Sequence, residues 1–209
     1  MRLTNLLTAL VIVVTPAVAA ADVIDFELAL PEGTVLSNEY ANVSFAGGRL
    51  VVPGLPATGF SGNSSGIGAG GEDDANSGQT LTSTSPTTDP IVITFDSAVR
   101  GAGLDLVDIE GYGGGDGESA TISVFDVPSG GTPIYTVTVS DVGQPLGYGD
   151  GALTHVDLSG FTGDTAIRRI EASRSFGEWG WAIDNVAYSF DPTSTNPETW
   201  GQVKSRFSN

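Results

Sequence analysis

Apolar and polar residues alternate in short segments along most of the chain. In Ala120–Val127 the apolar residues Ile122 and Val124 share one parity, and Ile134–Val139 alternates in the same way. Because successive side chains of a strand point to opposite faces, this period of two predicts half-buried β-strands. The segments of this kind are Val23–Leu28, Thr34–Ser37, Asn42–Phe45, Arg49–Val52, Ile91–Phe95, Val99–Val107, Ala120–Val127, Ile134–Val139, Ala152–Leu158, Ala166–Ser173 and Trp181–Phe190.

The number and spacing of these segments predict the fold class. About ten short strands, with no helical periodicity before residue 191, indicate an all-β antiparallel two-sheet sandwich of jelly-roll-like architecture. Another antiparallel sandwich is the alternative. The 29 glycines fit the many turns that such a fold requires. The loops fall between strands rather than between blocks of strands, so residues 22–190 are predicted to form one domain.

The stretch Gly180–Phe190 (GWAIDNVAYSF) breaks its own alternation. Trp181 and Ile183 share one parity, and the apolar residues after Asp184-Asn185 share the other. Either this strand is buried on both faces, or a bulge shifts the side chains and redirects the carboxylate. A carboxylate in such a place needs a partner, because burying an unpaired charge is costly.

Two regions differ from the strands in composition. Pro53–Pro90 is rich in glycine and serine and lacks periodicity, so it is predicted to be a long loop. It is either a surface insertion or a ligand loop centred on the acidic residues 72–74. Residues 191–209 are predicted to be a linker and a short C-terminal tail. Trp200–Phe207 has apolar residues at helical spacing, so the tail is either weakly docked or a recognition tag.

Residues Met1–Ala21 have the three parts of a secretory signal peptide. Arg2 supplies a positive charge, Leu6–Val14 is an apolar core too short for a comfortable membrane span, and A-x-A cleavage choices end near Ala19 or Ala21. Cleavage predicts a secreted protein, extracellular or at the cell surface, and an uncleaved anchor is the alternative. No later segment has a comparable apolar run, so no membrane span is predicted in the mature chain.

The chain is strongly acidic, with a formal net charge of −17. Without Met1–Ala21, 7 basic and 25 acidic residues remain, which gives −18. This charge disfavours nucleic acid and anionic membranes as partners and suits divalent cations. The chain contains no cysteine, so it uses neither disulfides nor thiolate chemistry.

A series of short motifs resembles one group of proteins. The motifs are IDFE, YANVSFAG, ITFDSAVRGAGLDL, ATISVFDV, AIRRIEAS and WAIDNVAYSF, in that order, within Val23–Phe190. They resemble the exported β-sandwich domains of bacterial PEP-CTERM-type surface proteins, which are similar to jelly-roll carbohydrate-binding modules. The resemblance leaves out the loop Pro53–Pro90. The chain also lacks the PEP box and the C-terminal apolar helix of that group, so the resemblance implies an exported domain without that anchoring system.

The resemblance also implies a metal site. In calcium-containing jelly-roll modules, a structural ion commonly joins an early-strand acid in an FE-like motif to an aspartate of the final strand. The matching positions here are Glu27, with Asp25 beside it, and Asp184. Calcium takes about six to eight oxygen ligands, so one Ca²⁺ at these carboxylates would link the first and last strands. In the alternative, Asp184 and Asn185 cap backbone N–H groups and Asp25 is simply exposed.

Catalytic chemistry has little support in the sequence. The only histidine, His155, lies with Thr154 and Asp157 on one predicted strand, too close together to form a nucleophile–base–orienter set. It is therefore interpreted as a satisfied strand histidine. The H-E-x-x-H motif is absent. The chain is predicted not to be an enzyme, and a small glycan-acting hydrolase is the least favoured hypothesis.

Aromatic residues near predicted loops form a candidate sugar-binding surface. Their flat rings suit stacking against the C–H face of a sugar, and packing at the ends of the sandwich is the alternative. Trp181, within a strand, is assigned to the core. The leading hypothesis is a secreted, non-catalytic binding module for glycans, and the alternative is a structural or adhesive cell-surface protein. The candidate ligand-binding residues are Tyr112, Tyr148, Phe176, Glu178 and Trp179.

Overall fold

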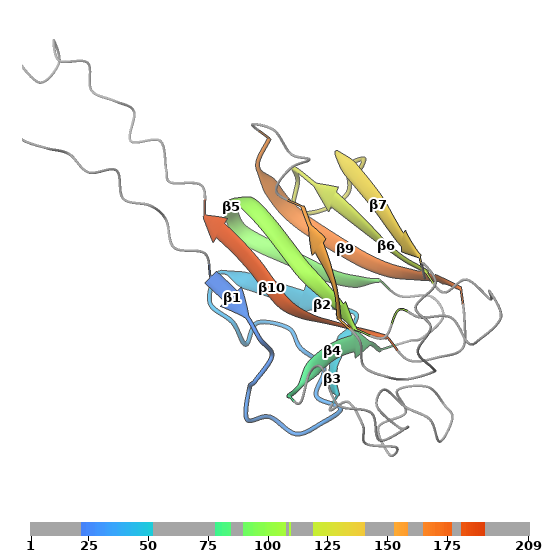
Figure 1. Cartoon of the computed structure of the whole chain (residues 1–209). Coiled ribbons are helices and arrows are strands. Elements are labelled where there is room, and N and C mark those ends of the chain that lie inside the picture. Colours follow the sequence, from blue (N-terminus) through green and yellow to red (C-terminus); the bar gives the residue numbers. More distant parts are fainter. Residues whose placement is uncertain are drawn as a thin grey trace, which may run out of the picture.

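The structure is a computed structural model that describes residues 22–51, 78–84, 90–107, 109, 119–140, 153–158, 165–176 and 181–190. These residues form ten strands in antiparallel pairs and contain no helix (Figure 1). The predicted all-β antiparallel sandwich is therefore confirmed. The strands are β1 (Asp22–Ile24), β2 (Val43–Ala46), β3 (Gly48–Val51), β4 (Thr80–Ser83), β5 (Ile91–Val107), β6 (Ser119–Phe125), β7 (Tyr135–Ser140), β8 (Leu153–Asp157), β9 (Ile167–Phe176) and β10 (Ala182–Phe190).

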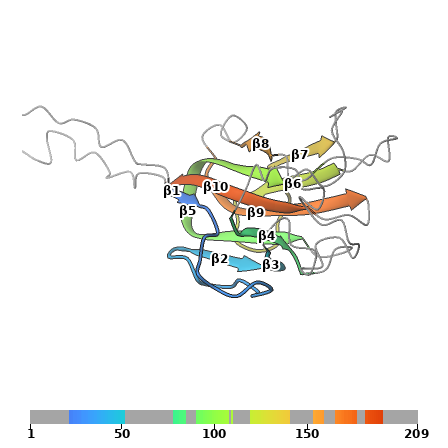
Figure 2. The same cartoon turned by 60° about the horizontal axis from the view of Figure 1, so that its bottom comes forward.

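The strands form two layers that share β5. In the first layer, β2 and β9 flank the N-terminal part of β5, and β6 and β7 follow β9. In the second layer, β8 and β10 flank the C-terminal part of β5. The other edge of β10 pairs with β1 and β4, and β3 lies beyond β4. The first strand of the sandwich therefore lies beside the end of the last one (Figures 1 and 2).

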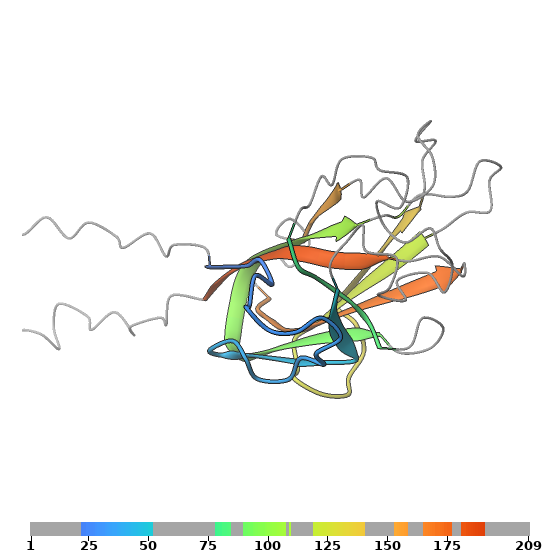
Figure 3. The ribbon, with the colours of Figure 1, turned by 90° about the horizontal axis from the view of Figure 1, so that it is seen from below.

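A corner within β5 connects the two layers. The sequence predicted two strands here, Ile91–Phe95 and Val99–Val107, whereas the structure has one strand of 17 residues. Its pairing with β9 shifts register between Thr94 and Val99, where the strand turns from one layer into the other (Figure 3). Arg168 donates hydrogen bonds to the carbonyl oxygens of Phe95 and Asp96, both at 3.2 Å. The guanidinium thus satisfies backbone acceptors that the turn releases from the ladder.

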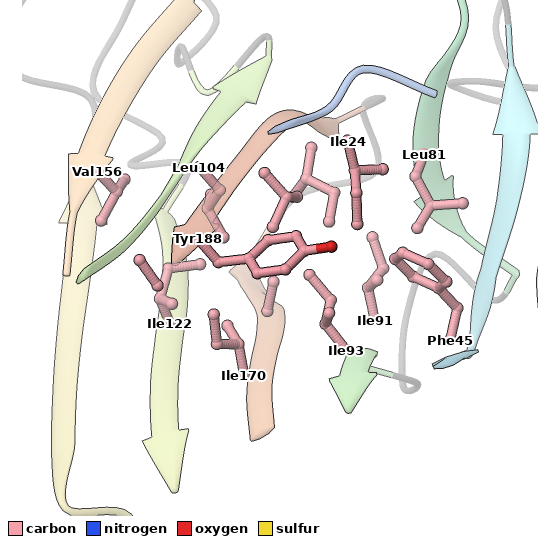
Figure 4. Close-up of a cluster of buried hydrophobic side chains, with 14 of the residues drawn as sticks. Ile24, Phe45, Leu81, Ile91, Ile93, Leu104, Ile122, Val156, Ile170 and Tyr188 are labelled. Atoms are coloured by element: carbon pink, nitrogen blue, oxygen red, sulfur yellow. The ribbon is translucent and has the colours of Figure 1, made fainter. Parts of the chain in front are cut away.

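The core lies between the two layers and draws on both (Figure 4). Ile93 and Ile170 come from the first layer, and Leu104 and Val156 come from the second. Tyr188 lies among them with its ring centroid 5.1 Å from that of Phe95. Burial of its phenol, followed by the nearby charge of Asp22, raises the pKa of Tyr188. Trp181 is 2% exposed, so its assignment to the core is confirmed.

One strand of the second layer falls inside the predicted loop Pro53–Pro90. β4 pairs with β3 along four residues and meets β10 where Leu81 faces Ile183. All four of its residues are buried, and the Thr82 hydroxyl donates to the carbonyl oxygen of Trp181 at 2.5 Å. The prediction missed β4 because the segment TLTS offers one apolar residue, which leaves no periodicity to detect. Its burial comes from tertiary pairing.

Two other predicted extended segments are shorter in the structure. The first strand ends at Ile24 instead of Leu28, because Phe26 has a φ of 56° and cannot continue a ladder. Thr34–Ser37 contributes one isolated bridge, between Val35 and Arg49. The first departure lies directly after the residues of β1 that pair with β10.

Candidate functional site

The first segment of the sandwich meets the last strand at a bulge in β10. β1 pairs with β10 through Ile24 and Val186, and the pairing of β10 with β5 shifts register between Asp184 and Ala187. Asn185 adopts a φ of 46°, the left-handed conformation that asparagine tolerates better than most residues. The sequence left a doubly buried strand and a bulge open, and the structure has both: residues 181–184 are all buried, and the bulge follows them.

The bulge explains how apolar residues of both parities are buried in one strand. Ile183 before it and Val186 after it are both fully buried, although they differ in parity. The extra residue shifts the alternation by one position. Asp184 lies at the shift and is 3% exposed, so its carboxylate is held inside the protein.

The segment after β1 carries the other two predicted ligand residues. The Phe26 ring is fully buried and forms edge contacts with Tyr40 and Phe45, at centroid distances of 6.2 and 5.8 Å. Its neighbours Asp25 and Glu27 are exposed. The aromatic side chain anchors this segment in the core and leaves an acid on each side of it.

Hydrogen bonds fix the two exposed acids. Oδ1 of Asp25 accepts from the backbone N–H of Glu27 at 3.2 Å. Oε1 of Glu27 accepts from the backbone N–H of Gln79 at 2.9 Å, immediately before β4. The same carboxylate lies against Gly78 so closely that a methyl group at position 78 would overlap it. Glu27 therefore joins the first segment to the start of β4.

Tyr40 shows that the three predicted ligand residues lie near one another. Burial of the phenol is the main cause that raises the pKa of Tyr40, and the negative charges of Asp25, Asp184 and Glu27 raise it further. The backbone of Phe26 acts in the opposite direction. Because such effects fall off with distance, all three carboxylates lie within electrostatic range of this one hydroxyl. Acids from both ends of the sandwich therefore lie within electrostatic range of Tyr40.

The chemistry of this junction (Asp25, Glu27, Tyr40 and Asp184) is anionic and oxygen-rich. Within the described ranges, no three acidic, histidine or cysteine side chains are grouped closely enough to hold a metal ion. An ion at the junction would therefore also take backbone carbonyl or water oxygens, which calcium accepts readily. The donor set fits a hard cation better than a zinc-type ion.

A second polar group lies on β5, β8 and the bulge. Nδ1 of His155 lies 2.7 Å from Oδ1 of Asp105, and Oδ2 of Asp105 accepts from the Asn185 side-chain amide at 2.9 Å. In the strand register Asp105 faces both His155 and Asp184. The interpretation of His155 as a hydrogen-bonded strand residue is confirmed. Sequence reasoning missed Asp105, because only the pairing of three strands shows its position.

The predicted sugar-binding residues fall almost entirely outside the described part of the chain. Tyr112, Tyr148, Glu178 and Trp179 lie there, and Phe176 ends β9, where its backbone pairs with Ser119. The signal segment 1–21, the acidic residues 72–74 and the tail 191–209 also lie outside the described residues. Glycan binding therefore stays a prediction. In the described residues, no helix is long and apolar enough to span a membrane.

Comparison with solved structures finds a likeness to a bacterial adhesin domain. No protein-family model matches the chain, and no curated protein matches it. The chain is similar to the K1 cleaved adhesin domain of Lys-gingipain from Porphyromonas gingivalis W83, at 12% sequence identity and a TM-score of 0.44. The match covers 82% of this chain and 99% of that domain. The resemblance to the PEP-CTERM-type domains stays a prediction from the sequence motifs.

Proposed function

We propose that the chain is an exported, non-catalytic surface domain with an adhesive role. We further propose that one calcium ion at the junction links its first segment to its last strand. The observation that supports the calcium proposal is that Asp25, Glu27 and Asp184 all lie within electrostatic range of Tyr40, near the place where the first segment meets the last strand. The ion would take ligands from Asp184 and from the Asp25–Glu27 segment. The adhesive role is supported by an uncharged hairpin edge at β6 and β7.

The electrostatic argument for a cation rests on three like charges within electrostatic range of one hydroxyl. An ionised carboxylate loses its hydration when it is buried, and Asp184 is 3% exposed. Asp25 and Glu27 add negative charge within range of the same hydroxyl. A bound dication would offset the mutual repulsion of these groups, and its own charge would lower the pKa of Tyr40.

The mechanical argument rests on chain topology. Ligands at residues 27 and 184 would connect the two ends of the domain in a protein that contains no cysteine. Because the ion would bind the folded state alone, it would stabilise that state by mass action. A surface domain closed in this way resists unfolding from its ends.

Thermal unfolding with and without calcium tests this proposal. Calcium at about 100 times its Kd is expected to raise the melting temperature by roughly 5–10 °C over that in EDTA. Asp184→Asn should abolish the difference, whereas Asp126→Asn, in the exposed β6–β7 turn, should keep it. A melting temperature that calcium does not change in the native chain would overturn the calcium closure.

A further inference from the structure

The β6–β7 hairpin forms one end of the described first layer of the sandwich. Among the described strands, β7 pairs with β6 alone, and Figure 1 shows β7 as the outermost strand of that layer. Such an edge is a template for another strand, and proteins usually protect it with charges, proline or a bulge. Tyr135–Ser140 (YTVTVS) contains no charge and no proline, and its pairing with β6 has no register shift.

The hairpin is almost uncharged within a strongly acidic protein. Ser119–Ser140 contains one charged residue, Asp126, in the turn, whereas the whole chain has a net charge of −17. Two copies of such a chain repel each other wherever their acidic surfaces approach. The hairpin is a place where two copies can meet with little repulsion.

Hydroxyl side chains form paired rows on the outer face of the hairpin. The hydroxyl oxygens of Thr121 and Thr138 lie 3.1 Å apart, and those of Ser123 and Thr136 lie 3.3 Å apart. Cross-strand threonine and serine pairs of this kind stabilise antiparallel strands. Thr136 and Thr138 are exposed at the edge, so a further strand with hydroxyls at matching positions would extend the rows.

The inner side of β7 favours an apolar partner. Tyr135, Val137 and Val139 are half-buried and pack against the core cluster, which leaves part of each side chain at the rim. Ile134, just before the strand, is 37% exposed. A strand that covers this rim needs apolar residues at alternate positions and hydroxyls between them. The sequence of β7 itself has this pattern.

We propose that β7 is a self-association edge, on which β7 of a second copy pairs antiparallel about Val137. In this register Thr136 faces Thr138 of the second copy, and Tyr135 faces Val139. The outer hydroxyl rows then continue from one sheet into the next, and the half-buried valines meet below them. The inference rests on the proposed adhesive role only in that it names a partner for it, another copy of this chain.

The size of this contact sets its strength. A six-residue strand buries far less than a standard interface of about 1,600 Å², so the contact is weak between dissolved molecules. Many copies held on one surface would strengthen it through avidity. Tests in solution therefore require protein concentrations up to about 1 mM, at a salt concentration that screens the net charge.

A charge swap across the edge tests the register directly. Thr136→Lys/Thr138→Lys and Thr136→Glu/Thr138→Glu each place like charges opposite one another in the pair of copies. Sedimentation equilibrium is expected to show that each variant alone associates about tenfold more weakly than the native chain. A mixture of the two variants should form a heterodimer, because each lysine then faces a glutamate.

The matched control lies one strand inward. Thr121→Lys/Ser123→Lys removes the same hydroxyl pairs but leaves the edge unchanged, so the copies should associate as the native chain does. If the double substitutions lower the melting temperature, the single variants Thr136→Lys and Thr138→Glu in a mixture give the same test. A native chain that stays monomeric to about 1 mM would overturn the proposal, as would a mixture that associates no better than its components.

These outcomes separate the edge from the calcium closure. If the charge swap fails while the melting temperature still depends on calcium, only the proposed self-association through β7 is contradicted. A successful charge swap with a melting temperature indifferent to calcium contradicts the closure alone.

Discussion

The junction and the β6–β7 hairpin belong to the same sandwich but differ in how many charged residues they contain. At the junction, three carboxylates lie within range of one half-buried phenol, and one of the three is 3% exposed. The hairpin has one charged residue in 22 positions, at its turn. Concentrated charge suits a site that binds a cation and closes the fold. The near absence of charge on the hairpin suits a surface that contacts another acidic chain.

The two regions also differ in how firmly they are anchored. Phe26 at the junction is fully buried between Tyr40 and Phe45, whereas the apolar residues of β7 are half-buried at the rim. The backbone at the junction takes left-handed conformations at Phe26 and Asn185, and the hairpin strands keep a regular register. The stability of the junction is therefore expected to depend more on individual residues than the stability of the hairpin does.

The largest expected effect follows from this difference in anchoring. Phe26→Ala removes a buried ring and leaves a cavity beneath the junction, which is expected to cost about 3–5 kcal/mol. Val137→Ala, at the half-buried edge, is expected to cost about 1 kcal/mol. Denaturant unfolding measures both free energies. Equal costs for the two variants would contradict the proposed difference between junction and edge.

The conformation of Asn185 predicts the next effect. Asn185→Ala loses the hydrogen bond to Asp105 and forces a side chain other than asparagine or glycine into the left-handed region, at a cost of about 2 kcal/mol. Asn185→Gly loses the hydrogen bond but fits the backbone, so about 1 kcal/mol is expected. Urea unfolding of the pair provides the comparison. An alanine variant as stable as the glycine variant would show that the bulge relaxes in solution.

Alkaline pH is expected to weaken the junction. The pKa of Tyr40 is raised above its ordinary value near 10, so the folded state holds the phenol proton more tightly than the unfolded state does. This contribution to stability is complete below about pH 10 and is lost as the pH rises toward the folded-state pKa.

Tyr40→Phe should therefore reduce the fall in stability above about pH 10. Thermal melting of the native chain and the variant at a series of pH values measures this effect. Identical alkaline profiles for native chain and Tyr40→Phe would argue against the charged environment of Tyr40.

The smallest effect is expected at His155. Its ring is 65% exposed, so its interaction with Asp105 is screened by solvent. His155→Gln is expected to change stability by about 0.5 kcal/mol or less. Urea unfolding near pH 6 and pH 8 measures it. A loss comparable to that of Asn185→Ala would mean that the bulge depends on His155.

Much of the fold was accessible from the sequence because period-two alternation marks half-buried strands. The segments around Ile122 and Val137 became β6 and β7, and the parity change at Asp184-Asn185 became a bulge. β4 was missed, because Thr80 and Thr82 are buried by pairing with neighbouring strands and not by their own hydrophobicity. The two predicted segments are one strand, β5, in the structure. Local patterns do not reveal its corner, where backbone carbonyl oxygens accept hydrogen bonds from Arg168.

The candidate site was partly accessible in the same way. The sequence motifs pointed to Asp25, Glu27 and Asp184, and the strand pairing brings their segments together at Tyr40. Tyr40 and Asp105 were not predicted as members of any site, because their positions depend on tertiary packing and on the register of three strands. The free hairpin edge also depends on strand order, which alternation alone does not specify.

Calcium binding measured by isothermal titration calorimetry tests the central claim most directly. The native chain is predicted to bind one Ca²⁺ per molecule, and Asp184→Asn is predicted to bind at least tenfold more weakly, because it removes a buried anionic ligand. Asp126→Asn, in the exposed β6–β7 turn, should bind as the native chain does. No binding heat in the native chain, or equal affinity in Asp184→Asn, would contradict a calcium closure at the junction.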